Sequence, residues 1–164
     1  MNACFIGHRR IRITEDLIFS LQKVVLHLLK KGVTTFLFGS MSDFDKLSWE
    51  VVTSFKSEYP EIIRVYVRSS YQHIDELYEQ YILSNYEHTY YPVKIENAGK
   101  YSYVERNCEM IDNANYCVFY YDKNYVPEIK QTSKYLRVTK KNSGTKFAFE
   151  YALRKRKEII NLCQ

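Results

Sequence analysis

Short apolar runs alternate along the chain with segments of helical spacing, and this alternation constrains the fold more than any other feature. The apolar runs are predicted strands and lie at 3–6, 34–38, 62–67, 116–121 and 158–163. The segments with apolar residues at helical spacing are predicted helices and lie at 15–31, 44–55, 73–86, 103–114 and 143–157. Strands that alternate with helices predict a parallel sheet with helices on both faces, and near-continuous apolar strands suit a sheet buried on both sides.

The predicted architecture is therefore α/β, with three α/β/α layers and a mostly parallel sheet. With the five strands numbered in chain order, we expect the order 3-2-1-4-5. Thr14 and Asp43 are the predicted N-terminal caps of the first two helices. The 164 residues suffice for one core of ordinary size, so we expect a single domain over 1–164. A short further strand is predicted at 90–95, and the polar connection at 122–142 is predicted as either a lid or a hairpin.

Composition excludes several classes of protein. Apolar residues make up 46% and charged residues 26%, which excludes a disordered or fibrous chain. The four cysteines form no CxxC pair and no zinc-type spacing, so we expect no disulfide framework, no metal site and no cofactor. No apolar run approaches the roughly 18 residues of a membrane span, and the first ten residues lack the pattern of a signal peptide. We therefore expect a cytoplasmic protein with no membrane partner.

Basic charge is concentrated in two places, although the net charge is only +5. Nine basic residues and one acid lie between Lys134 and Lys157, and a second cluster comprises Arg9, Arg10 and Arg12. Two interpretations are open for these clusters, a solvated surface or a local anion site.

Three loops lie where the predicted parallel strands end or the last helix begins. They contain Gly7, His8 and Arg9, then Gly39 and Ser40 through Asp43, then Ser143, Gly144 and Thr145. In the order 3-2-1-4-5 the first and third loops flank the reversal of strand order, where α/β sheets bind ligands. A glycine lets backbone approach a ligand, and phosphate suits a helix N-terminus. The patterns GxGxxG, GxxxxGK[ST] and GxSxG are absent, so a standard dinucleotide site, a P-loop and a hydrolase elbow have no motif support.

Four separated motifs carry a family resemblance. In chain order they are CFIGHR, FGSMSDFDKLSWEVV, YVERNCEMIDNANYCVFYYD and SGTKFAFEYALRKRKEIINL. In order and spacing they resemble the YpsA-like family of the SLOG superfamily, whose name joins the DNA-processing protein DprA (SMF) and the LOG phosphoribohydrolases. The resemblance covers most of the chain outside 68–100 and 123–142. It implies a Rossmann-like fold and a nucleotide or nucleotide-derived ligand, with some members acting as sensors and others cleaving an N-glycosidic bond.

The resemblance also implies site residues. The family's motif positions fall on Gly7, Arg9, Gly39, Asp45, Arg106, Asn107, Asp112, Gly144 and Thr145. With His8, Ser40 and Ser143 from the loops, these are the predicted ligand-binding residues. The chain departs from the family at Asp43, which replaces a glycine. A carboxylate there would repel a phosphate unless Arg9 or a metal intervened. The catalytic glutamate of the LOG enzymes falls on Ala148, and Glu150 comes two residues later.

Single residues allow alternative roles. His8 is a candidate general acid, a ring that stacks on the ligand, or a loop hydrogen bonder. Asp45 is the second catalytic candidate. Helical geometry places Asp45 and Glu50 about 140° apart, which predicts that they do not face one crevice together. We expect Trp49 to pack in the core. Most tyrosines are predicted to be half-buried with a wet hydroxyl, and Tyr103 and Tyr121 are candidates for stacking on a base.

Three functions follow from these observations. The first is binding of a nucleotide-derived small molecule, with a possible role as a sensor. The second is an N-glycosidic hydrolase or transferase acting on a nucleotide, so whether the protein is an enzyme stays open. The third is single-stranded nucleic-acid binding through the basic segment near the C-terminus and its aromatic residues. Self-association through the tyrosine-rich helices is a further possibility.

Overall fold

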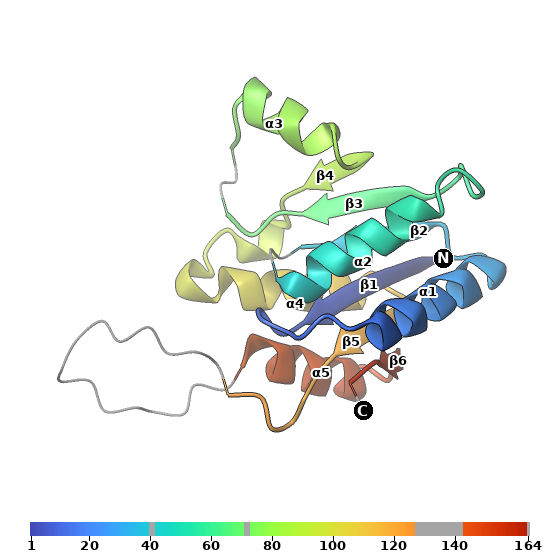
Figure 1. Cartoon of the computed structure of the whole chain (residues 1–164). Helices are drawn as coiled ribbons and strands as arrows, with labels where there is room; N and C mark the ends of the chain where they lie inside the picture. The colour runs from blue at the N-terminus through green and yellow to red at the C-terminus, as the bar shows by residue number, and fades with distance from the viewer. Residues whose placement is uncertain (40–41, 71–72, 127–142, 164) are drawn as a thin grey trace.

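The computed structural model describes residues 1–39, 42–70, 73–126 and 143–163. Six parallel strands form one sheet in the order β4-β3-β2-β1-β5-β6 (Figure 1). The strands are β1 (Asn2–Gly7), β2 (Thr35–Phe38), β3 (Ile63–Val67), β4 (His88–Tyr90), β5 (Tyr116–Tyr120) and β6 (Glu158–Asn161). The helices are α1 (Glu15–Lys30), α2 (Asp43–Ser54), α3 (Glu76–Leu83), α4 (Ser102–Asp112) and α5 (Gly144–Arg154), with short 3-10 helices η1 (Val93–Ile95) and η2 (Gly99–Tyr101).

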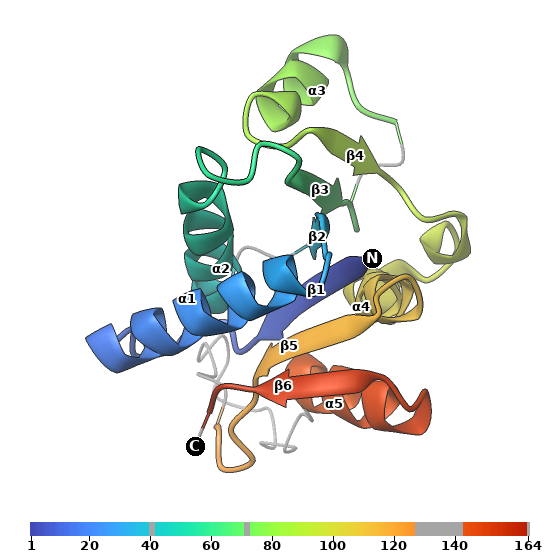
Figure 2. The same cartoon turned by 90° about the vertical axis from the view of Figure 1, so that its right-hand side faces the viewer.

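Helices cover both faces of the sheet, as the sequence predicts. Figure 2 shows α1 and α2 on one face and α4 and α5 on the other, with α3 beyond the β4 edge. Successive side chains of β1 enter opposite layers, because Phe5 packs with α1 and α2 whereas Cys4 and Ile6 pack with α4 and α5. None of the helices in the described ranges is long and apolar enough to cross a membrane.

The predicted strand order is confirmed for the five strands it concerned. The sixth strand extends the β3 edge, but it comprises His88–Tyr90 rather than the predicted 90–95. Pro92 follows it with φ −64°, and Val93–Ile95 turn into η1. Proline lacks the backbone N–H that a strand ladder needs, so the chain leaves the sheet at this point.

Capping residues set where the helices begin. The Thr14 hydroxyl accepts from the Leu17 N–H at 3.2 Å, which confirms that cap. The prediction for Asp43 was wrong, because the Ser42 hydroxyl accepts from the Asp45 N–H at 3.0 Å and Asp43 is the first residue of α2. Asp75 caps α3, so that helix begins at Glu76 rather than at 73. Most of the connection predicted as a lid or hairpin lies outside the described residues.

Glu87 fastens the edge strand β4 to β3. Its carboxylate accepts from the Arg64 backbone N–H at 2.6 Å, from Arg64 Nη2 at 2.8 Å and from Lys56 Nζ at 2.7 Å. Burial raises the pKa of Glu87, but the hydrogen bonds from Arg64 and Lys56 lower it further than burial raises it, to about 2. The ionised carboxylate therefore stabilises this edge of the sheet.

Replacing Glu87 with glutamine is expected to make the free energy of unfolding depend less on pH in the acid range. The depressed pKa of Glu87 contributes stability above the unfolded value of about 4.3, and this contribution is lost as pH falls toward 2. At pH 7 we expect Glu87→Gln to cost about 1–2 kcal/mol. Urea unfolding between about pH 7 and pH 2 measures both effects. The exposed Glu61→Gln serves as control, and equal pH profiles for Glu87→Gln and wild type would contradict the assignment.

Candidate functional site

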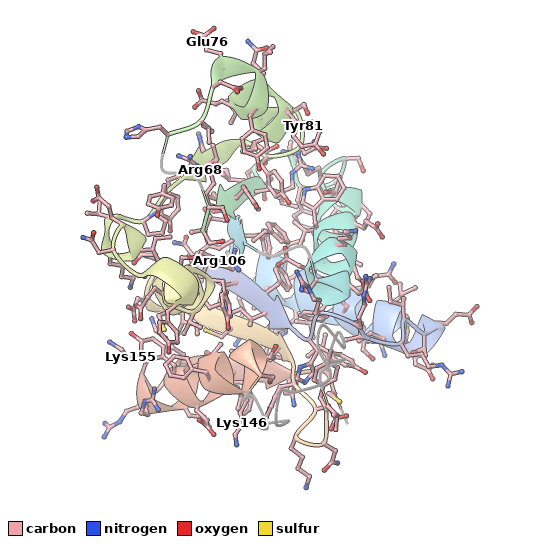
Figure 3. All side chains as sticks on the ribbon, turned by 90° about the vertical axis from the view of Figure 1, so that its left-hand side faces the viewer. Arg68, Glu76, Tyr81, Arg106, Lys146 and Lys155 are labelled. Carbon is pink, nitrogen blue, oxygen red and sulfur yellow. The ribbon has the colours of Figure 1, made fainter. Side chains whose placement is uncertain are left out.

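Three loops meet along the edge at which the strands end, and Figure 3 looks onto this edge. β1 and β5 are neighbours, while the chain moves from β1 toward β2 and from β5 toward β6. Their loops therefore flank the reversal of strand order that binds ligands in open α/β sheets. The described parts of the three predicted loops and the first turns of α2, α4 and α5 form the candidate site.

The first loop is packed tightly against its neighbours. A Cβ at Gly7 would lie 2.5 Å from Cβ of Phe44, so the glycine allows β1 to approach α2. His8 is only 1% exposed, and its Nε2 accepts from the Asp122 N–H at 2.9 Å. Its ring stacks on Tyr125 with centroids 3.8 Å apart. Burial lowers the pKa of His8, so the neutral ring acts as a loop hydrogen bonder, one of its three predicted roles.

Asp43 joins the first loop to the start of α2. Its carboxylate accepts from Arg10 Nη1 at 3.2 Å and from the Ile11 N–H at 3.3 Å, and its own N–H donates to the Arg9 carbonyl at 3.0 Å. Arg10 therefore offsets the charge of Asp43, in the role that the sequence assigned to Arg9 or a metal. Arg9 keeps an exposed side chain beside the end of β1.

Gly39 lets Arg106 cross the end of the sheet. A Cβ at Gly39 would lie 2.6 Å from Cδ of Arg106 and 2.7 Å from Sδ of Met110. Arg106 is 4% exposed, and its burial lowers its pKa while the charge of Asp45 raises it. Asp45 is 3% exposed at the start of α2. The charge of a cation from the α4 layer thus acts on a carboxylate from the α2 layer across the end of β2. The predicted site residue Ser40 lies outside the described residues.

The residues predicted on α4 lie in its middle and at its C-terminal end. Asn107 accepts a hydrogen bond from Arg106 Nε at 3.0 Å, so it orients that side chain. Asp112 is the last residue of α4 and lies about 9 Å beyond Arg106 along the helix axis. There it accepts a hydrogen bond from the Tyr151 hydroxyl at 3.0 Å and pairs with Lys94 at 3.1 Å. The helix runs away from the candidate site, so the structure does not bring Asp112 to the other predicted residues.

The third loop meets the start of α4. Ser143 caps α5 by accepting from the Lys146 N–H at 3.1 Å, and Thr145 is buried in the first turn. A Cβ at Gly144 would lie 3.0 Å from the exposed ring of Tyr103. Figure 3 shows Arg106 near the middle of this edge and Lys146 of α5 below it. The second and third loops thus both contact the first turns of α4.

A pocket of about 300 Å³ lies between α2, α3 and β3, and sequence reasoning missed it. Its lining residues are Asp45, Lys46, Trp49, Glu50, Tyr66, Tyr78, Tyr81, Ile82, Asn85 and Tyr86. The buried Asp45 and the exposed Glu50 both line it, although helical geometry separates them by about 140° around α2. Trp49 packs against the core as predicted but also lines the pocket. The concentration of tyrosines between 66 and 86 was the feature of the sequence that could have indicated this pocket.

The two catalytic candidates have little access to solvent. Asp45 and His8 are both buried, and Nε2 of His8 already accepts a hydrogen bond. Glu150 is exposed on α5 and pairs with Lys146 at 3.9 Å. Within the described residues no group of three His, Cys, Asp or Glu side chains could hold a metal ion. Binding is therefore better supported by this geometry than acid–base chemistry.

Comparison with known proteins shows a similarity of fold. No family model and no curated protein sequence matches the chain. Its structure is similar to that of DNA processing protein A from Helicobacter pylori, described for its single-stranded DNA binding mode, with a TM-score of 0.56 and 15% sequence identity. The match covers 97% of this chain and 63% of that one, so this chain spans less than two thirds of that protein. The chain thus has the Rossmann-like α/β fold that DNA processing protein A also has.

Proposed function

We propose that the protein binds a nucleotide or nucleotide-derived molecule at the edge where the strands end, as a single YpsA-like domain of the SLOG superfamily. The proposal rests on the convergence of the three predicted loops. The first loop joins the start of α2 through Asp43, and the other two contact α4 at Arg106 and Tyr103. The exposed guanidinium of Arg9 and the N-terminus of α5 supply positive potential for a phosphate. A sensor role agrees with the burial of both catalytic candidates.

Thermal unfolding with candidate ligands tests this function. Nucleoside mono- and diphosphates, ADP-ribose and cyclic nucleotides are the probes. A ligand at one hundred times its Kd adds about 2.7 kcal/mol of stability, so we expect Tm to rise by about 5–10 °C. Arg9→Ala should abolish the rise, whereas Arg12→Ala, an exposed arginine of the same loop, should retain it. If no probe raises Tm at millimolar concentration, the proposal fails.

Single-stranded nucleic acid is the second candidate ligand. It is favoured by the fold shared with a protein described as binding single-stranded DNA, and by the exposed face of α5. There the guanidinium of Arg154 lies 5.8 Å from the ring of Phe147, which is itself exposed, and Lys146 is exposed nearby. Aromatic and basic side chains of this kind hold single strands. Oligonucleotide binding that falls steeply with salt and resists Arg9→Ala would favour this candidate over the first.

A further inference from the structure

The pocket between α2, α3 and β3 has the size and lining of a site for a small aromatic ligand. Its volume of about 300 Å³ lies at the lower end of the range for small-molecule sites, roughly 300–1,000 Å³. It opens beside the candidate site, because Asp45 belongs to both. Figure 3 shows Tyr81 of α3 above Arg106 on this side of the molecule.

Aromatic rings from three elements form the walls. Tyr66 of β3 and Tyr86 have ring centroids 5.3 Å apart, and Trp49 of α2 lies 6.2 Å from Tyr86. On α3, Tyr78 and Tyr81 lie nearly parallel, with 6.3 Å between centroids and 14° between planes. Tyr81 is 67% exposed. The pocket therefore offers aromatic faces to solvent, and every nucleobase has a face that can stack on them.

The charged side chains of the pocket are two carboxylates and one lysine. Asp45 is buried in its lining, and Glu50 is exposed at its rim beside Lys46. Burial raises the pKa of Tyr66 and of Tyr86, and the charge of Asp45 adds to both increases. The phenols of Tyr66 and Tyr86 thus stay protonated at neutral pH and can donate hydrogen bonds. Because a carboxylate only accepts hydrogen bonds, a ligand that gains from the exposed Glu50 must carry a hydrogen-bond donor, such as an amino group.

We propose that this pocket binds the base of the ligand, and that it prefers an amino-substituted nucleobase such as adenine, cytosine or guanine. The inference rests on the proposed function for the class of ligand and adds the position of its base. Stacking on the tyrosines holds the flat ring, and the exocyclic amino group donates to the exposed carboxylate of Glu50. A neutral ring suits the pocket better than an organic cation, because cations of the protein already offset the charge of both carboxylates. Arg106 interacts with Asp45, and Lys46 lies beside Glu50.

Trp49 is the single tryptophan of the chain and lines this pocket, so its fluorescence reports occupancy. Adenosine, cytidine and guanosine are expected to quench it in a saturable titration, each with a Kd at least tenfold lower than that of uridine, which lacks the amino group. The same titration of N-acetyl-tryptophanamide corrects for absorption by the nucleosides. Nucleosides are used because they lack the phosphate that the loops are proposed to bind.

Matched variants of α3 locate the site. Tyr81→Ala removes an exposed wall of the pocket and should raise the Kd of adenosine by about tenfold. Leu77→Ala, on the same helix and 79% exposed but outside the pocket, should leave it unchanged. Glu50→Gln should reduce the ratio of the Kd of uridine to the Kd of adenosine. Far-ultraviolet circular dichroism of each variant checks that the helix and sheet content is retained.

Several outcomes would overturn the inference. They are the absence of saturable quenching by any nucleoside at millimolar concentration, equal Kd values for adenosine and uridine, quenching by tetramethylammonium as strong as that by adenosine, or binding unaffected by Tyr81→Ala. A nucleotide that raises Tm through Arg9 without changing the Trp49 signal would refute only the pocket. Nucleoside quenching without any Arg9-dependent shift would support the pocket and refute the phosphate part of the proposed function.

Discussion

Replacing Arg106 with methionine is expected to lower the free energy of unfolding by about 3 kcal/mol. Methionine keeps an alkyl chain across Gly39, but it removes the buried cation whose charge acts on the buried carboxylate of Asp45. Loss of one member of a buried charge interaction costs more than loss of a surface pair. Urea unfolding at neutral pH measures the loss, and Arg154→Met, which changes a basic residue of α5 outside the loops, is the control.

A double-mutant cycle with Asp45→Asn identifies the cause of that loss. In the Asp45→Asn background the same Arg106→Met change should cost only about 1 kcal/mol, because the neutral amide no longer needs a cation. If the cost is equal in both backgrounds, Asp45 is not the group that Arg106 stabilises. The cycle then assigns the effect to packing of Arg106 against Gly39 and Met110.

Gly7→Ala is expected to destabilise the protein by about 3 kcal/mol, at the upper end of typical overpacking costs. The added methyl group would lie 2.5 Å from Cβ of Phe44 and 2.5 Å from its Cδ1. Cβ is fixed to the α2 backbone, so the ring cannot rotate to remove this contact, and β1 or α2 must shift. Thermal or urea unfolding measures the loss.

Gly144→Ala is the matched control for Gly7→Ala. Its added methyl group would lie 3.0 Å from the far edge of the Tyr103 ring, which is exposed and can move. Alanine is also a better residue for a helix than glycine. We therefore expect a change within about 1 kcal/mol. If Gly7→Ala were equally mild, the close approach of β1 to α2 would not explain the glycine.

The order of the central strands could be predicted because apolar strands that alternate with helices are typical of a parallel sheet covered by helices on both faces. The role of Gly39 could not be predicted in the same way. Its position after β2 suggested an approach to a ligand, whereas in the structure its missing side chain gives room to Arg106, 67 residues later in the chain. Local spacing identifies a glycine at a strand end but not the side chain that comes to lie against it.

The tyrosine pocket depends on contacts that periodicity does not encode. Tyr66 comes from β3, Tyr78 and Tyr81 from α3, and Trp49 from α2. Helical spacing alone gave the angle between Asp45 and Glu50 but not the shape of the surface that α3 adds beside them. The tyrosine-rich composition of the chain indicated many half-buried rings. Contacts far apart in the sequence bring α3 alongside α2, among them the hydrogen bond from Trp49 to the Asn85 carbonyl and the pairing of Glu87 with Arg64.

One wall of the pocket belongs to a shallowly packed part of the described fold. α3 buries only Ile82, and none of the three residues of β4 is buried. Such a unit opens locally at a lower free energy than the central strands. A molecule held between α2 and α3 would therefore slow amide hydrogen exchange in α3 more than in β1 or β5. Ligand binding in the pocket and the local stability of α3 and β4 are thus coupled. A bound ligand reduces the local opening of these two elements, and the core does not need to move.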